Sequence, residues 1–171
     1  ITTAPDGLPV SMNLAAMQLR KEVGDCDEEL VALTLAAAVD YVQHQYGLRL
    51  LTQTLIEYHT APPCGGQPLV LFNRPMTAVT KVEYKHPDTE AWTEATLADF
   101  TTSPLLGGFL CVYPVISESW PSVAPSEASV RITCTGGYGS TGEDVPAKIR
   151  QRILLMLADF YENRENPRMS L

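Results

Sequence analysis

The clearest pattern in the sequence is a helical one near the C-terminus. Over residues 145–164, apolar side chains recur at spacings of three and four, which places them on one face of a helix. The residues of this face are Ile149, Ile153, Met156, Leu157 and Phe160, with Leu154, Leu155 and Tyr161 widening it. Pro146 suits the first turn of a helix, where its missing N–H is no loss. We therefore predict a core helix over 145–164 that the rest of the chain covers on most of its circumference.

Two further helices are predicted near the N-terminus. Ser11 can cap a first helix that runs to about residue 23 and carries Leu14, Met17 and Leu19 inward. Gly24 breaks this helix. The acidic residues that follow, Asp25, Asp27 and Glu28 around Cys26, resemble a capping box at the start of the next helix.

The second helix is predicted to run to about residue 46, with Gly47 directly after its C-terminus. Its apolar residues form two stripes: Leu30, Leu33, Ala37 and Tyr41 in one, and Val31, Leu35, Ala38 and Val42 in the other. The small residues Ala36, Ala37 and Ala38 would let another helix approach closely. We expect this helix to be the main cover of the C-terminal one.

Between these helices the apolar period changes to two, and turn residues multiply. The predicted strands span residues 52–59, 69–72, 79–86, 109–113 and 129–135, with a turn at Pro87-Asp88 before a short continuation near Trp92. The segments 62–66 and 117–126 are predicted loops. Because strand follows strand without an intervening helix, the sheet should be mainly antiparallel.

The predicted fold class is therefore α+β, with an N-terminal helix pair and a C-terminal helix packed together around a β-rich middle. A chain of 171 residues with 45% hydrophobic content corresponds to a single domain with room for a core. We divide it into a helical part (10–48), a β-rich part (50–136), the C-terminal helix (145–165) and a tail (166–171).

The charge distribution narrows the function. A net charge of −8 argues against a general nucleic-acid binder, because affinity for phosphates comes chiefly from Lys and Arg. From residue 145 onward the chain carries five basic and three acidic residues, a net +2 that leaves −10 on the rest. A mildly basic end on an acidic body fits head-to-tail complementarity with a partner, or simply a soluble surface.

The pattern gives no indication of a metal, a cofactor or a membrane. Cys26, Cys64, Cys111 and Cys134 lack metal-ligand spacing, and we interpret them as reduced cytosolic thiols, with Cys111 and Cys134 in strand cores. The three histidines, at positions 44, 59 and 86, have no partner at ligand spacing either. We expect no transmembrane helix and no signal peptide. The sequence begins with Ile1 rather than Met, so residues may precede it.

One literal motif requires an explanation. Residues 137–142 spell G-x-G-x-x-G between a predicted strand and a predicted helix, as in dinucleotide-binding folds. Such a site also needs a second parallel strand with an acidic residue about 20 residues further on, and too little chain follows. Glu143 and Asp144 would also repel a phosphate. We interpret the segment as a flexible loop.

No catalytic pattern is present in the sequence. Glu28 and Glu29 fit a favourable charge at a helix start better than acid–base chemistry, and no Ser lies in a G-x-S-x-G context. We expect the protein not to be an enzyme. Trp92 and Trp120 are of a type that usually packs in cores, but Trp120 sits beside Pro121 in a polar loop, where partial exposure would make it an interface anchor.

Taken in order, several segments resemble the head–tail connector (adaptor) proteins of tailed bacteriophages, in their longer, β-containing branch. The resemblance extends from about residue 10 to 165 and rests on the order and spacing of its pieces. These pieces are Val10-Ser11, Gln18-Leu19-Arg20, the run Tyr46-Gly47-Leu48-Arg49-Leu50-Leu51-Thr52-Gln53-Thr54, Leu71-Phe72-Asn73-Arg74-Pro75-Met76, Val79 with Val82-Glu83-Tyr84, Trp120-Pro121, Val130-Arg131-Ile132-Thr133-Cys134-Thr135-Gly136-Gly137-Tyr138-Gly139, Val145-Pro146, Ile149-Arg150-Gln151 and Tyr161-Glu162-Asn163-Arg164-Glu165. The pair Gln151-Arg152 and the cysteines depart from the usual pattern.

The resemblance implies a non-enzymatic structural protein of the virion neck, made in the host cytoplasm. Such proteins form a ring, usually twelvefold, under the portal protein, extend the DNA channel, and offer a platform for the next neck or tail-completion protein. Their C-terminal segment commonly docks on the portal, which here implies Glu162, Asn163, Arg164, Glu165, Asn166, Pro167, Arg168, Met169, Ser170 and Leu171. For contacts between subunits we single out Arg49, Trp120 and Tyr138.

An acidic lumen would fit this role, because DNA could slide through it without attractive phosphate contacts. We expect Asp and Glu of the break between the first two helices, or of the β loops, to line it. Two alternatives stay open: another neck or completion protein of the same virion, and a small ligand-binding module with a pocket in the β-rich part. Exposed apolar loops would favour a connector, whereas a concave site with converging polar groups would favour a binding module.

Overall fold

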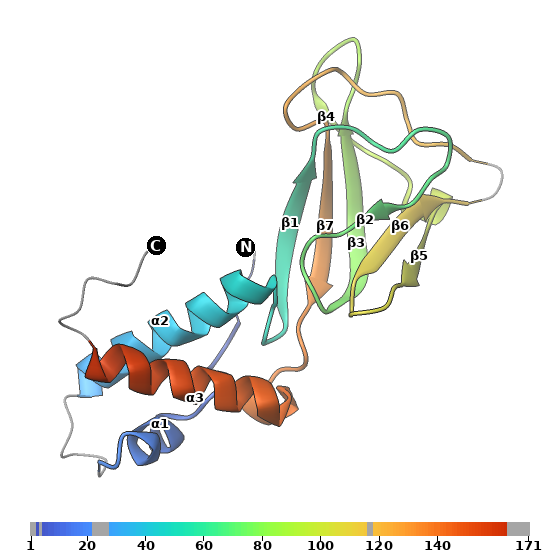
Figure 1. Ribbon diagram of the computed structural model, residues 1–171. Helices are drawn as coiled ribbons and strands as arrows, with labels where there is room; N and C mark the ends of the chain where they lie inside the picture. The colour runs from blue at the N-terminus through green and yellow to red at the C-terminus, as the bar shows by residue number, and fades with distance from the viewer. Residues whose placement is uncertain (1–2, 4, 22–27, 116–117, 164–171) are drawn as a thin grey trace. The chain divides into compact units, whose positions relative to one another are not determined.

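The computed structural model describes residues 3, 5–21, 28–115 and 118–163 (Figure 1). The chain divides into two compact units. One, the β unit, comprises Ile1–Pro5 and Thr52–Gly137; the other, the helical unit, comprises Asp6–Leu51 and Tyr138–Leu171. The sequence predicts a single domain with helical and β-rich segments. In the structure each kind of segment has a hydrophobic core of its own, and the α+β fold class is confirmed.

The first helix of the helical unit, α1 (Met12–Gln18), is shorter than predicted. Its cap is confirmed, because the Leu14 N–H donates to Ser11 Oγ at 3.3 Å. The prediction that Leu14 and Met17 point inward is wrong, since their side chains are 40% and 64% exposed. The helix instead turns Ala15 and Ala16 to the core.

The second helix, α2 (Glu28–Tyr46), buries only one of its two predicted stripes. Val31, Leu35, Ala38 and Val42 lie in the core, whereas in the other stripe Leu33 and Tyr41 are exposed. One side of the helix is enough to cover its neighbours, so the second stripe is left at the surface. Gly47 has a φ of 60°, and the N–H groups of Gly47 and Leu48 donate to carbonyls of the last turn, which confirms the predicted glycine cap. The predicted capping box over 25–28 lies mostly outside the described residues.

The C-terminal helix, α3 (Ala147–Glu162), begins directly after Pro146. Ile153, Leu157 and Phe160 are buried, and Ile149, Met156, Leu154 and Tyr161 pack partly buried against the same core. Leu155 is 50% exposed, so the expectation that this face extends around most of the helix is wrong. α3 packs mainly on α2, as predicted, and also touches α1.

The β strands pair antiparallel, as predicted, but they form two sheets where the sequence predicted one. The larger has the strand order β1-β7-β3-β4 and the smaller β2-β6-β5 (Figure 1). The strands are β1 (Gln53–His59), β2 (Leu69–Val70), β3 (Met76–Lys85), β4 (Trp92–Glu94), β5 (Phe100–Pro104), β6 (Leu110–Pro114) and β7 (Val130–Gly136). Two 3₁₀ turns, η1 (Leu97–Asp99) and η2 (Gly142–Asp144), follow β4 and β7 respectively. β5 was not predicted, because the sequence FTTSP offers only one large apolar side chain.

Buried and more exposed residues alternate along two strands of the β unit, β1 and β7. In β1 and β7 every second residue is buried, and the inward set of the larger sheet includes Leu55, Val82 and Ile132. Leu71, in the segment that follows β2, and Val112, in β6 of the smaller sheet, join the same core. Cys111 and Cys134 are buried in strands, as predicted, while Cys64 is exposed.

Candidate interaction surfaces

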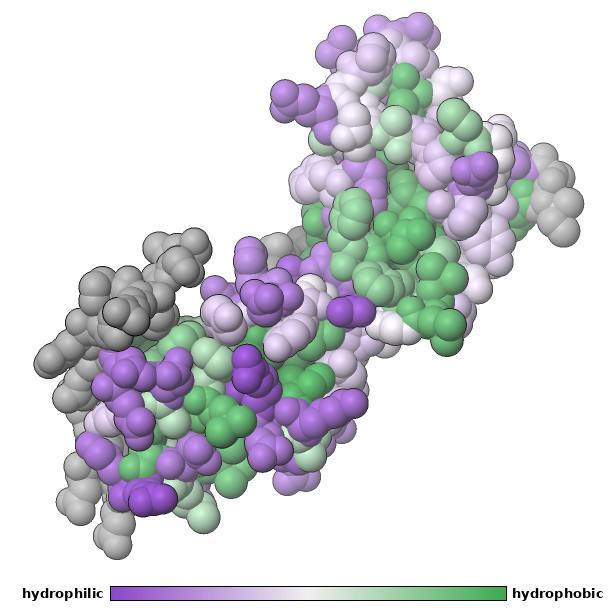
Figure 2. Space-filling view, viewed as in Figure 1, coloured by the Kyte–Doolittle hydropathy of each residue, from purple (hydrophilic) through white to green (hydrophobic). Residues whose placement is uncertain are grey.

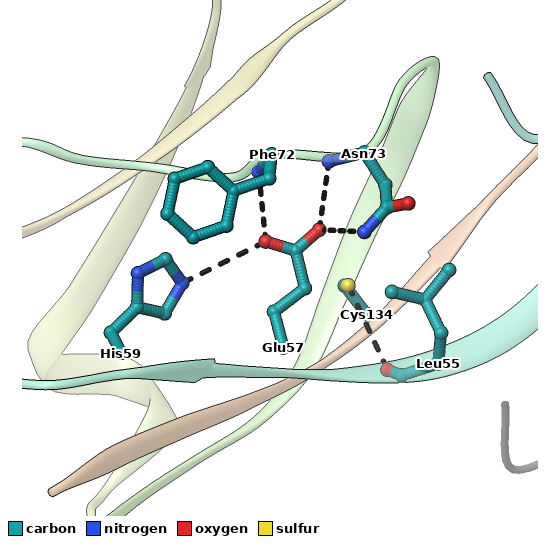
Figure 3. A network of polar contacts seen from close by, with 6 residues as sticks. All are labelled: Leu55, Glu57, His59, Phe72, Asn73 and Cys134. Atoms are coloured by element: carbon teal, nitrogen blue, oxygen red, sulfur yellow. Dashed lines mark hydrogen bonds and ion pairs between the residues drawn. The ribbon is translucent and has the colours of Figure 1, made fainter. Parts of the chain in front are cut away.

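The most developed polar site in the described chain is a buried carboxylate network in the β unit (Figure 3). Glu57 lies on the inward face of β1 and is only 4% exposed. Its two oxygens accept hydrogen bonds from the Phe72 N–H (2.8 Å), the Asn73 N–H (2.9 Å) and the Asn73 side-chain amide (2.6 Å). The carboxylate thus satisfies backbone donors of the segment after β2 that have no strand to pair with.

His59 completes this network. Its Nε2 lies 3.7 Å from a Glu57 oxygen, and its ring stacks on Phe72 with centroids 4.8 Å apart. Burial of the Glu57 carboxyl raises its pKa, but the neighbouring His59 and the hydrogen bonds from Asn73 and Phe72 lower it by more. The net pKa lies below its ordinary value of 4.5. A carboxylate held ionised by backbone donors is suited to fixing a loop rather than to acid–base chemistry.

The segment that Glu57 fixes runs beside the hairpin between β5 and β6. The Leu71 N–H donates to the Leu110 carbonyl and the Met76 N–H to the Gly108 carbonyl. The Arg74 guanidinium lies 4.8 Å from the centroid of the Phe109 ring, at the base of the hairpin turn. The network therefore holds the side of the hairpin in place.

The hairpin ends in an apolar tip, Leu105–Gly108. Leu106 is 98% exposed and Leu105 46%, and Gly107 and Gly108 have positive φ values that allow the tight turn. Phe72, whose backbone Glu57 holds, is 67% exposed. Hydrophobic residues also gather at the visible surface of the β unit (Figure 2). Large apolar side chains this exposed on a rigid support are typical of interaction surfaces.

The outward face of the larger sheet carries a row of charges. Arg131 on β7 donates two hydrogen bonds of 2.7 Å to Glu83 on β3, and Lys81 bridges Glu83 and Glu94 at 3.0 and 3.1 Å. The Arg131 guanidinium also lies 4.4 Å from the centroid of the Trp92 ring. Hydrogen bonds from Arg131 and Lys81 lower the pKa of Glu83 although burial raises it. The row is satisfied within the sheet and binds the short strand β4 to it.

The glycines of the G-x-G-x-x-G segment have structural reasons. A side chain at Gly139 would collide with Asp144, and one at Gly142 with the carbonyls of Leu8 and Pro9. Asp144 accepts from the Thr141 N–H and hydroxyl at 2.9 Å each, and these two bonds lower its pKa. The segment leads from β7 through η2 to α3 without a parallel strand beside β7. Its expected flexibility stays a prediction.

The structure brings two of the three predicted subunit-contact residues close in the fold. The Tyr138 N–H donates to the Leu50 carbonyl at 3.0 Å, and Leu51 and Gly139 form an isolated β-bridge. The segments that contain Arg49 and Tyr138 therefore run side by side. Both residues are half-buried. Their role in subunit contact stays a prediction.

Trp120, the third of these residues, is only 9% exposed. Its indole N–H donates to the Gln67 carbonyl at 3.0 Å, and its ring packs on Phe100. The expected partial exposure is therefore wrong. A carbonyl partner for the indole lets this polar-looking loop residue join the core.

Most of the predicted docking segment lies outside the described residues. Glu162 and Asn163 are described: Glu162 ends α3, and the Asn163 side-chain amide donates to the carbonyl and carboxylate of Asp159. Residues 164–171, which include the predicted contacts from Arg164 to Leu171, are not described. The docking role stays a prediction.

No helix in the described residues is long and apolar enough to cross a membrane. The described part of the chain also lacks any cluster of three or more His, Cys, Asp or Glu that could hold a metal ion.

Comparisons with known proteins place the fold. No family model matches the chain, and no curated protein matches it in sequence. The solved chains that match it in structure include one from the virion of a native gene transfer agent (GTA) particle (TM-score 0.77, 19% identity, covering 99% of this chain and 86% of that one), one from the neck of an empty GTA particle computed with C6 symmetry (0.74, 21%, 94% and 81%), and one from the neck of a native GTA particle computed with C12 symmetry (0.71, 18%, 99% and 86%). The chain thus shares its fold, over nearly its whole length, with chains of a phage-like virion and its neck.

Proposed function

We propose that this protein is a non-enzymatic structural component of the neck of a tailed-phage-type virion, acting as a head–tail connector. The observation that carries the proposal is the fold match over 99% of the chain to a chain of a GTA virion, with two further matches to chains of GTA necks. The ordered sequence resemblance to phage adaptors points to the same role. Exposed apolar side chains at the hairpin tip, Leu105 and Leu106, supply contact area for assembly.

In this role the protein forms a ring beneath the portal protein and extends the DNA channel. The neck structures of two neighbours were computed with C6 and C12 symmetry, which fits the twelvefold ring that the resemblance implies. A ring repeats one contact between two different surface patches of the subunit. Because many copies dock together on a symmetric partner, each contact can be modest.

The acidic body suits the channel. With a net charge of −8, a lumen lined by carboxylates would let DNA pass without sticking. A structure of the ring with a basic lumen would contradict this part of the proposal while leaving the connector role intact.

The direct test is to mix the purified chain with the portal protein of its own genome and image the product by electron microscopy. We expect a ring of added density below the portal. If the chain is folded, as circular dichroism would verify, and no density is added, the connector role is wrong and a search for a ligand becomes the next step.

The C-terminal docking hypothesis has its own test. A chain shortened by residues 164–171 keeps Asn163, which ends α3 through its bonds to Asp159, so its melting temperature should change little. We expect portal binding to weaken strongly, measured by co-sedimentation. Normal binding by the shortened chain would show that docking uses another surface.

A further inference from the structure

The helical unit leaves one face of each of its two long helices uncovered. On α2 the uncovered face contains Leu33, which is 69% exposed, and on α3 it contains Leu155, which is 50% exposed. Figure 2 shows hydrophobic residues exposed between hydrophilic ones on this unit. A single exposed leucine is common on protein surfaces, so the argument for a contact rests on the charges that lie beside each leucine.

The α2 face is apolar in the middle and acidic at its ends. Leu33, Ala36 and Ala37 form its centre, with Glu29 before them and Asp40 after them, all exposed. α2 contains no Lys or Arg, so the acidic side chains at the two ends of this face are not offset by a Lys or Arg of the same helix. Small alanines beside one leucine form a shallow seat that another helix can approach closely.

The α3 face has the opposite sign over its first half. Lys148 and Arg152 are exposed one turn apart, and Leu155 follows on the same side of the helix. Within the described residues, neither these two cations nor Glu29 and Asp40 take part in an ion pair. The face from Lys148 to Leu155 thus offers a leucine and two cations without an ion-pair partner in the described residues.

The two faces lie on opposite sides of the helix pair. At 100° per residue, Leu33 and Asp40 stand about 180° from the centre of the buried stripe of α2, and Leu155 stands close to opposite the buried stripe of α3. Because the buried stripes share one core, the exposed faces point away from each other. They cannot meet within one chain, but they can meet between chains.

We propose that the α3 face (Lys148, Arg152, Leu155) of one copy packs on the α2 face (Glu29, Leu33, Asp40) of the next. The occupant is a second copy of this chain, because the two faces complement each other in charge and in their exposed leucines. Two different patches on opposite sides of a subunit make a heterologous contact, which propagates from copy to copy. This proposal rests on the ring architecture of the proposed function and specifies the subunit contact within it.

A cysteine pair tests the contact. In a Cys26→Ser, Cys64→Ser background, where the buried Cys111 and Cys134 are left in place, Leu33→Cys and Leu155→Cys are combined in one chain and oxidised. We expect a ladder of disulfide-linked dimers, trimers and larger species. Each single variant should give no ladder, and an equimolar mixture of the two singles should give dimers only. Asp88→Cys combined with Leu155→Cys is the matched control, because the Asp88 side chain is 86% exposed in the β unit.

The oxidation is carried out on two samples: the purified chain at high concentration, and purified particles of its virus. In the particles, an immunoblot of the Cys26→Ser, Cys64→Ser chain without added cysteines reports whether the protein is incorporated into the virion. Incorporation with a ladder supports both the function and the contact. Incorporation without a ladder, or with a ladder equal to that of the control pair, overturns the contact and leaves the function standing. A ladder in solution without incorporation supports the contact and overturns the function. Dimers of Leu33→Cys alone would show a symmetric contact and overturn the proposal.

Charge reversal gives a second, independent test. Arg152→Glu should lower the ladder yield roughly threefold to tenfold at low salt, as expected when an attractive surface pair becomes a repulsive one. Adding Asp40→Lys to the same chain should restore the yield, because each contact would again pair opposite charges. Adding Asp88→Lys instead should not restore it. Equal restoration by both would show that only net charge matters and would overturn the specific contact.

Discussion

The helical unit and the β unit have interiors of different chemistry. In the described residues every buried polar or charged side chain, namely Gln53, Glu57, His59, Glu83 and Ser129, belongs to the β unit. The core of the helical unit is apolar throughout. A helix satisfies its backbone internally, whereas a small sheet with long connections leaves backbone donors that side chains must satisfy. The comparison predicts that the two units respond to different perturbations.

The two tryptophans make this comparison measurable. Trp92 and Trp120 both lie in the β unit, so tryptophan fluorescence reports on that unit alone. Circular dichroism at 222 nm is dominated by α1, α2 and α3, which all lie in the helical unit. The two signals can therefore be followed in one sample.

The largest effect is expected from Leu157→Ala. Leu157 is fully buried in the helical core, and its truncation should cost about 2–5 kcal/mol. The transition at 222 nm should move to lower denaturant, while the fluorescence transition moves much less. Leu155→Ala on the exposed side of the same helix is the control and should be near neutral. Equal shifts of both signals would show that the units unfold as one.

Glu57→Gln should have the next largest effect, on the β unit. In the parent protein both Glu57 oxygens accept hydrogen bonds from the Phe72 and Asn73 N–H groups. The substitution removes the negative charge and replaces one of these oxygens by an amide –NH₂, so a donor faces a donor. The free energy of unfolding should fall by about 1–3 kcal/mol. Urea unfolding followed by fluorescence measures this cost. Glu90→Gln, at an exposed turn residue, should leave the midpoint unchanged. A midpoint equal to that of the parent would show that the Glu57 network contributes nothing to stability.

Acid should destabilise the β unit. The pKa values of Glu57 and Glu83 lie below 4.5 in the folded protein, so the unfolded chain binds more protons as the pH falls. The stabilisation is fully present above pH 4.5 and is lost as the pH falls through the lower, folded values. The fluorescence midpoint in urea should drop below pH 4.5, and the drop should shrink in the Glu57→Gln, Glu83→Gln double variant. A urea midpoint that does not change with pH would contradict the lowered pKa values of Glu57 and Glu83.

The smallest effect on stability is expected from Leu106→Ser. Its side chain is 98% exposed at the hairpin tip, so the free energy of unfolding should change by less than about 0.5 kcal/mol. If the tip is an assembly surface, particle yield should fall nonetheless. The control is Asp88→Ser. The Asp88 side chain is also largely exposed, at 86%, and its replacement should leave the particle yield unchanged.

Sequence periodicity was sufficient where one face of an element is buried against many neighbours. It predicted α2, α3, most strands and the glycine cap at Gly47, because apolar spacing and cap chemistry are local. It failed at β5 and at Leu14, Met17, Leu33 and Leu155, because exposure depends on how much of each helix its neighbours cover. Apolar spacing alone cannot distinguish a residue that contacts its own core from one that contacts another molecule.

The polar network was also beyond the reach of local patterns. Glu57 occupies an inward strand position that alternation assigns to an apolar residue, and its partners lie 15 and 16 residues away. Only the order of its strand face, Leu55-Glu57-His59, carried a signal: a charged residue between inward positions requires buried partners. Trp120 shows the reverse case, where a polar neighbourhood concealed a core residue.

The helical unit is assembled from two segments of the chain, with residues 52–137 between them. During synthesis the last strand of the β unit is therefore made before α3. Until α3 is present, the buried stripe of α2 lacks the helix that covers it, and α1 and α2 form only part of the core. The helical core is therefore complete only when α3 docks, and α3 is the same helix whose outer face we assign to the contact with the next copy.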